Sequence, residues 1–234
     1  MRKGFGVIAV FAAAVTALLP MPAARVSAAS AVKDWSHTVT TTASGAYILG
    51  NPAAKVRIVE YLSFTCPHCA HFAAEAMPPL TADYIRPGLV SIEARHALRD
   101  PADFAAALLT RCTGPSTYFA AAGRVFAGQE TWFPKLAAYE QANQDKLKAM
   151  SHDEALSAIA GAAGLASIAG VPADRAKACL ADKAEQDRLG KMATEAWTGR
   201  KIEGTPSFLL NGTLLAGTAT WEALKPKIDA ALRK

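Results

Sequence analysis

The stretch VRIVEYLSFTCPHC, residues 56–69, decides the fold. Residues 56–62 are rich in β-branched and aromatic side chains and have the length of a strand. An alanine-rich segment typical of a helix follows from residue 70 to about 84, and Pro78 and Pro79 are expected to kink or split it. The two cysteines therefore lie where a strand ends and a helix begins.

The segments around this stretch predict two halves of a single sheet. Further strands are expected at residues 47–49 and 89–94, and a hairpin with an Asn-Gly turn is expected at residues 207–215. An amphipathic helix is expected from Trp221 to Arg233. The order is that of a βαβ unit followed, much later, by a ββα unit.

Between these halves, residues 101–198 contain helix formers and no convincing strand, and we expect four or five helices there. Asp100-Pro101 has the pattern of a helix start, and residues 151–154 fit a capping box. The predicted fold class is α/β, with an all-helical domain inserted into a sheet domain. The sheet domain covers residues 46–99 and 200–234, and the helical insertion covers residues 100–199.

The N-terminus has the pattern of a secretory signal peptide over residues 1–29. Arg2 and Lys3 precede an apolar run of about fifteen residues, shorter than the roughly 20 that span a bilayer, and small residues follow at 27–29. We expect cleavage after Ala28 or Ala29; an uncleaved anchor is the alternative. Residues 30–45 are rich in Ser, Thr and Ala and are expected to form a flexible lead-in. The mature protein is expected in an exported compartment, where disulfides persist.

Composition excludes two broad classes. The chain has 234 residues, of which 51% are hydrophobic and 19% charged, so it is too apolar for a disordered protein. The net charge is +5, but Arg2, Lys3 and Arg25 lie in the predicted leader, and their removal leaves +2. That is an ordinary surface charge, and we expect no nucleic-acid partner.

Cys66-Pro67-His68-Cys69 is the motif that carries chemistry. The first N–H groups of a helix lack internal partners, and the helix dipole is positive there, so a thiolate at Cys66 would be stabilised. His68 can add positive charge or a hydrogen bond beside the sulfur. Pro67 fixes φ without removing a needed donor. We expect Cys66 to be exposed and Cys69 to be covered by the helix.

Two other segments are candidates for the same site. Strand alternation places Glu60 on the apolar face with Leu62, where its pKa should be raised and where it could exchange a proton with Cys69. The alternative is a solvated glutamate on the strand. Thr205-Pro206 precedes a strand; with a cis peptide bond, the Thr205 backbone could face Cys66 and pair with an extended substrate, and an ordinary trans proline is the alternative.

Cys112 and Cys179 both lie in the helical block. In an exported protein we expect them to form a structural disulfide, which would close a long loop and add roughly 4 kcal/mol of stability. The alternative is a pair of buried free thiols.

A metal site is the first rival function. Cys66, Cys69 and His71 offer three ligands, but a structural zinc site needs four and the sequence has no second cluster, so we expect no metal. Haem attachment requires a histidine directly after the second cysteine, where Ala70 stands.

Residues 59–69 resemble the active-site segment of the DsbA family of thioredoxin-fold disulfide oxidoreductases. Residues 204–208 resemble that fold's cis-proline loop, and the helical block lies where the family carries its insertion. The resemblance covers about residues 46–233. It implies a thioredoxin-like fold in which Cys66 is the attacking cysteine, Cys69 its partner, Glu60 the buried acid and Pro206 the cis-proline. Thr205 departs from the valine of the best-known oxidases and matches the disulfide isomerases.

The resemblance implies a periplasmic disulfide oxidase, without a cofactor, that acts as a monomer. Its expected partners are reduced exported client proteins and a DsbB-type membrane quinone oxidoreductase that restores the disulfide. An isomerase and a reductase of the same fold are the redox alternatives. Isomerases of this fold carry an N-terminal dimerisation domain, and residues 30–45 are too few to build one. A holdase for exported chains is the non-redox alternative, and the intact cysteine pair argues against it.

Overall fold

The computed structural model describes residues 1, 3, 4, 6, 9 and 33–234. The predicted signal peptide and its cleavage site lie outside these residues, apart from the isolated positions near the N-terminus. Within the described part of the chain, no helix has the length and apolar character that crossing a membrane requires.

A six-stranded sheet carries the fold, in the order β1-β2-β4-β3-β5-β6. β3 and β4 are parallel, and the other neighbouring pairs are antiparallel. The strands after β1 agree with the expected ones to within two residues, and the Asn211-Gly212 turn has positive φ at both residues, as its hairpin requires. The strands are β1 (Val39–Thr41), β2 (Tyr47–Gly50), β3 (Val56–Leu62), β4 (Val90–His96), β5 (Ser207–Leu210) and β6 (Thr213–Leu214).

β1 corrects the expectation of a flexible lead-in over residues 30–45. Val39–Thr41 are β-branched residues that pair with β2 at the edge of the sheet. The turn that joins the two strands is held by the Thr42 N–H, which donates to the Ala46 carbonyl at 2.8 Å, and by the Ala46 N–H, which donates to the Thr42 hydroxyl at 3.0 Å. The serines and threonines that look like a linker in the sequence thus stabilise a turn.

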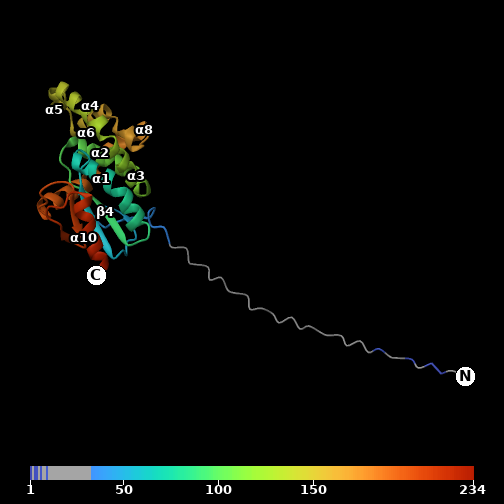
Figure 1. Cartoon of the computed structure of the whole chain (residues 1–234). Coiled ribbons are helices and arrows are strands. Elements are labelled where there is room, and N and C mark those ends of the chain that lie inside the picture. The colour runs from blue at the N-terminus through green and yellow to red at the C-terminus, as the bar shows by residue number, and fades with distance from the viewer. Residues whose placement is uncertain (2, 5, 7–8, 10–32) are drawn as a thin grey trace. The chain divides into compact units, whose positions relative to one another are not determined.

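Helices cover both faces of the sheet. α1 (Pro67–Pro79), the π-helical turn η1 (Leu80–Ile85) and α10 (Trp221–Arg233) pack on one face, as the labels in Figure 1 show for α1 and α10. Val56 and Ile58 of β3 point to this face, whereas Tyr61 points to the other, where Ala196 of η2 (Glu195–Gly199) covers it. The expected effect of Pro78 and Pro79 is seen as the end of α1 and its passage into η1.

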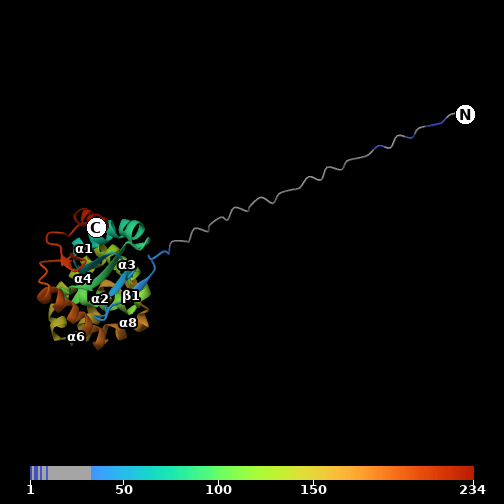
Figure 2. The same ribbon diagram turned by 90° about the horizontal axis from the view of Figure 1, so that it is seen from below.

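The helical block runs from Pro101 to Gly199, and Figures 1 and 2 show most of its helices gathered beyond one end of the sheet. The described chain has eight α-helices here, where four or five were expected. One of the additional helices has five residues and lies between Gly164 and Gly170, which both adopt the left-handed conformation. The predicted caps at Asp100 and Ser151 are confirmed. The helices are α2 (Pro101–Cys112), α3 (Pro115–Ala127), α4 (Gln129–Ala142), α5 (Gln144–Ala149), α6 (His152–Ala163), α7 (Leu165–Ala169), α8 (Ala173–Leu180) and α9 (Lys183–Thr194).

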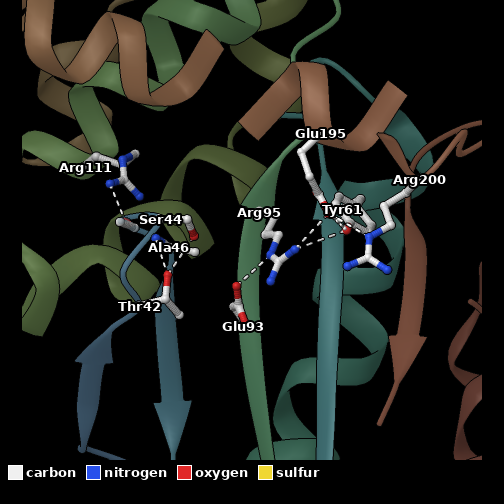
Figure 3. Close-up of polar contacts among 10 residues, drawn as sticks. Thr42, Ser44, Ala46, Tyr61, Glu93, Arg95, Arg111, Glu195 and Arg200 are labelled. Carbon is white, nitrogen blue, oxygen red and sulfur yellow. Dashed lines mark hydrogen bonds and ion pairs between the residues drawn. The ribbon is translucent and has the colours of Figure 1, made fainter. Parts of the chain in front are cut away.

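The insertion shares its core and its polar contacts with the sheet. One hydrophobic cluster contains Leu62 and Phe64 together with residues of α2, α3 and α6. A second link is polar: Arg95 of β4 pairs with Glu93 at 2.6 Å and with Glu195 at 3.1 Å. Figure 3 shows Arg95 between these two carboxylates. The Tyr61 hydroxyl donates to Glu195 at 2.9 Å. The end of the helical block is therefore fastened to the two central parallel strands.

Candidate active site

Cys66 occupies the N-cap of α1, directly after the loop that leaves β3. Pro67 is the first helical residue, and its fixed φ suits that position. The Cys66 carbonyl accepts from the N–H groups of Cys69 and Ala70 at 3.2 Å, which closes the first turn of the helix. The cysteine motif thus lies at a helix start, as the sequence indicated.

The Thr205-Pro206 peptide bond is cis, and the loop that contains it lies against Cys66. In its thiol form Cys66 donates a hydrogen bond to the Thr205 carbonyl oxygen at 3.0 Å. β3 and β5 are antiparallel neighbours, so the loop that follows β3 and the loop that precedes β5 lie at the same end of the sheet. The expectation of an exposed Cys66 is wrong: the residue is 3% exposed because this loop covers it, while Cys69 is fully covered.

The pKa values of the two thiols are shifted in opposite directions. The pKa of Cys66 is lowered to about 5, first because the Cys69 thiol donates a hydrogen bond to its sulfur, with the N–H groups of Cys69 and His68 adding to this against the effect of burial. The pKa of Cys69 is raised, first by burial, then by that same hydrogen bond and by the charge of Glu60. A reactive thiolate next to a protonated thiol is the state expected of a dithiol redox pair.

Glu60 is buried on the face of the sheet that α1 covers, so the alternative of a solvated glutamate is wrong. Burial raises the pKa of its carboxyl to about 8. Its charge reaches Cys69, and its side chain lines a cavity that lies beside α1. Near neutral pH it is therefore mostly protonated and can act as a proton donor.

The two histidines of the motif region lie at the surface. His68 is exposed, and within residues 33–234 its side chain makes no hydrogen bond, so its contribution at the sulfur is that of its backbone N–H. His71 lies on the exposed side of α1, 3.2 Å from Glu75. In the described residues no group of three or more His, Cys, Asp or Glu side chains is placed to bind a metal ion.

The helical insertion holds the loop before Cys66 through side chains that the sequence did not reveal as functional. The Asp103 carboxylate accepts from the Phe64 N–H at 2.7 Å, and the Gln129 amide donates to the Phe64 and Cys66 carbonyls at 2.7 and 3.1 Å. Asp100 accepts from the Thr65 hydroxyl at 2.5 Å. Only Asp100 had a sequence signal, as a helix cap; Gln129 had none, since its partners are distant backbone atoms.

A buried histidine was also missed. His96 ends β4 with no exposed surface, and its Nε2 lies 3.1 Å from the Tyr118 hydroxyl of α3. Burial lowers its pKa well below the usual range, so it is neutral. It lies two residues beyond the predicted strand at 89–94 and before the helical block, and this position was the available signal.

Cys112 at the end of α2 and Cys179 in α8 form a disulfide, with 5.8 Å between their Cα atoms. They therefore form a bridge inside the helical block, separate from Cys66 and Cys69, which are both free thiols.

Comparisons with known proteins agree with this geometry. The thioredoxin family model matches residues 42–230. A relative from Rickettsia felis, named "Putative protein-disulfide oxidoreductase", is 28% identical over 188 residues, which cover 80% of this chain but 60% of the relative. The chain therefore spans only part of the length of such relatives.

Solved structures show the same fold. A protein-disulfide isomerase from Novosphingobium aromaticivorans is 36% identical, with a TM-score of 0.75, and the match covers 80% of this chain and 97% of that one. Wolbachia pipientis alpha-DsbA1 is 22% identical, with a TM-score of 0.65, over 82% of this chain and 94% of that one. The expected thioredoxin-like, DsbA-like fold is thus confirmed, and the chain belongs to the thioredoxin family.

Proposed function

We propose that this protein is an exported thiol:disulfide oxidoreductase that donates the Cys66–Cys69 disulfide to folding proteins in the periplasm. The observation that carries the proposal is the contrast between the two thiols, with the pKa of Cys66 lowered to about 5 and that of Cys69 raised. A stabilised Cys66 thiolate favours the reduced form of the pair, and this makes its disulfide a good oxidant.

The reaction takes two electrons from a client dithiol. A client thiolate attacks the Cys66 sulfur of the disulfide, which forms a mixed disulfide and releases Cys69 as a thiolate. Cys69 takes a proton, for which the buried Glu60 carboxyl is the nearby donor. A second client thiolate then attacks the client sulfur of the mixed disulfide. The client leaves with a disulfide, and Cys66 departs as a stabilised thiolate.

The cis-proline loop supports a docking place for the client. Thr205 presents its carbonyl to the Cys66 sulfur at 3.0 Å. An extended client segment next to Thr205 and Pro206 would have its cysteine beside Cys66, with backbone hydrogen bonds that do not depend on the client's sequence. This suits an enzyme that acts on many unfolded chains.

Oxidase is preferred to isomerase or reductase as the direction of the reaction. Thr205 before the cis-proline, and the name of the Novosphingobium relative, favour isomerase as the second candidate. Continuous oxidation requires a partner that removes the electrons, and a DsbB-type membrane quinone oxidoreductase is the partner we propose. The acting form proposed is a monomer without a cofactor.

The equilibrium of the Cys66–Cys69 pair with glutathione tests the direction. We expect a potential closer to the roughly −120 mV of DsbA than to the roughly −270 mV of thioredoxin. A value near that of thioredoxin would make the protein a reductase. The matched control is Cys66→Ser, which should abolish both the equilibrium and the oxidation of a reduced client; turnover retained in that variant would contradict the mechanism.

A further inference from the structure

Beside α1 lies a cavity of about 440 Å³, which we call the Glu60 cavity. It is bounded by β3, β4, α1 and α3, together with the start of α4. Its size falls within the roughly 300–1,000 Å³ typical of small-molecule sites. The cavity volume is left open because small residues from different elements line it: Ala70, Ala73, Ala74, Ala94, Ala122 and Gly123.

Glu60 is the buried carboxyl that lines this cavity, beside the buried amide of Gln129 and the buried Tyr118. Glu60 is 6% exposed, and within residues 33–234 no side chain or backbone group makes a hydrogen bond or ion pair with its carboxyl. A buried carboxyl without a partner is costly, and a ligand that supplied a donor or a positive charge would remove that cost. The carboxyl lines the cavity, so such a ligand could reach it.

The rest of the lining favours a cation with an apolar body. Tyr118, Phe119 and Phe126 place aromatic rings along the wall, and rings of this kind attract ammonium groups. The other acid is Glu130, which is exposed at the opening. No lysine or arginine is among the lining residues of the described chain. The other titratable groups there are the buried Tyr118 and the exposed His71, which lies 3.2 Å from Glu75.

We propose that the Glu60 cavity binds a small hydrophobic primary amine, with its ammonium group paired to the Glu60 carboxylate and its apolar body against the alanine and aromatic wall. The pairing satisfies the unpartnered carboxyl, and the apolar body contacts a lining that is mostly apolar. Binding does not require the redox reaction. Occupancy would also engage the acid that serves Cys69, and this second effect alone rests on the proposed function.

Titration calorimetry of the purified protein near neutral pH tests the site with three probes of equal chain length. We expect 1-hexylamine to bind saturably at one site, and 1-hexanol and hexanoate each to bind at least about tenfold more weakly. The alcohol forms no charge-assisted pair, and the carboxylate brings a negative charge into the cavity with no cation to pair with. Glu60 is mostly protonated near neutral pH, so binding of the ammonium should release close to one proton. Repeating the titration in buffers of different ionisation enthalpy measures that release.

Two variants and a control locate the site. Glu60→Gln should weaken hexylamine to the level of hexanol and abolish the proton release. Gly123→Leu should block all binding; Gly123 lies in α3, and a Cβ there meets nothing within 4 Å, so the side chain can enter the opening without strain. Glu93→Gln is the control, since Glu93 lies on the neighbouring strand and pairs with Arg95 instead.

Equal binding of hexylamine and hexanol, or hexylamine binding that survives both Glu60→Gln and Gly123→Leu, would overturn the proposal. Neither result would contradict the proposed function, because the glutathione equilibrium tests that function separately. A slower client oxidation in the presence of hexylamine, absent in Gly123→Leu, would show the second effect.

Discussion

Replacing Gln129 with leucine should alter both the stability of the protein and the redox balance of Cys66. The Gln129 amide donates to the carbonyls of Phe64 and Cys66. The Cys66 carbonyl keeps its helical partners, but within residues 33–234 the Phe64 carbonyl has no other donor. A buried carbonyl left without a partner costs about 1–3 kcal/mol, and this is the expected loss in free energy of unfolding.

The expected change in redox potential follows from the position of Gln129 against the loop before Cys66. If Gln129 holds the first turn of α1 against the Cys66 sulfur, its loss weakens the N–H groups that stabilise the thiolate, and the pKa of Cys66 rises. A rise of one unit corresponds to about 1.4 kcal/mol, or about 30 mV toward a more reducing potential. The reduced form should therefore lose more stability than the oxidised form.

Urea unfolding of the oxidised form, ultraviolet titration of the Cys66 thiolate and the glutathione equilibrium measure these quantities separately. Gln186→Leu is the matched control: Gln186 is also a buried amide that donates to a carbonyl, that of Leu180 at 2.7 Å, but it lies in α9. It should lower stability without moving the potential. If Gln129→Leu lowers stability and leaves the thiolate pKa and the potential unchanged, the insertion does not tune the site.

Three further outcomes are expected. The thiolate of Cys66 should add about 2–3 kcal/mol to the free energy of unfolding of the reduced protein at pH 7, because its folded pKa of about 5 lies below the unfolded value. This contribution grows as the pH rises toward about 8.5 and is lost as the pH falls through 5. Urea unfolding of Cys66→Ser should lack this pH dependence. Replacing both Cys112 and Cys179 with alanine should lower the free energy of unfolding by roughly 4 kcal/mol, with the glutathione equilibrium unchanged; a shift in that equilibrium would assign them a redox role. Glu60→Gln should slow formation of the mixed disulfide at neutral pH more than its resolution by the second client thiol, as single-turnover kinetics would show, and an unchanged rate of formation would exclude a proton-donor role.

The sequence predicted the elements that local patterns determine. The run of β-branched residues at 56–62 gave β3 with its observed bounds, and the Asn211-Gly212 turn gave the last hairpin. β1 was missed because a short edge strand of threonines has no buried face to impose an apolar alternation. The helical block was read as fewer helices because glycine at a helix end is hard to distinguish from glycine inside one.

The candidate site was predictable as far as its motif extends. Cys66, Cys69 and Glu60 follow from a strand, a helix start and the alternation between them. The contacts of Gln129 and Asp103 with the loop before Cys66 could not be predicted, since they join residues at least 39 positions apart in the chain. Cys66 is buried by the loop that contains Thr205, whose carbonyl contacts the sulfur only when β5 is paired with β3.

The pairing of β3 with β5 has a consequence for how the chain folds. Ile58 lies opposite Leu210, so one side of the central strand gains its partner only after the whole helical block has been synthesised. At about 5–20 residues per second, translation leaves that edge open for roughly 8–30 s. An unpaired hydrophobic strand edge is a template for aggregation, so a nascent chain needs this edge shielded until β5 emerges. Cys66 and the cis-proline loop are brought together in the same late step, and a partly made chain therefore lacks the assembled candidate site.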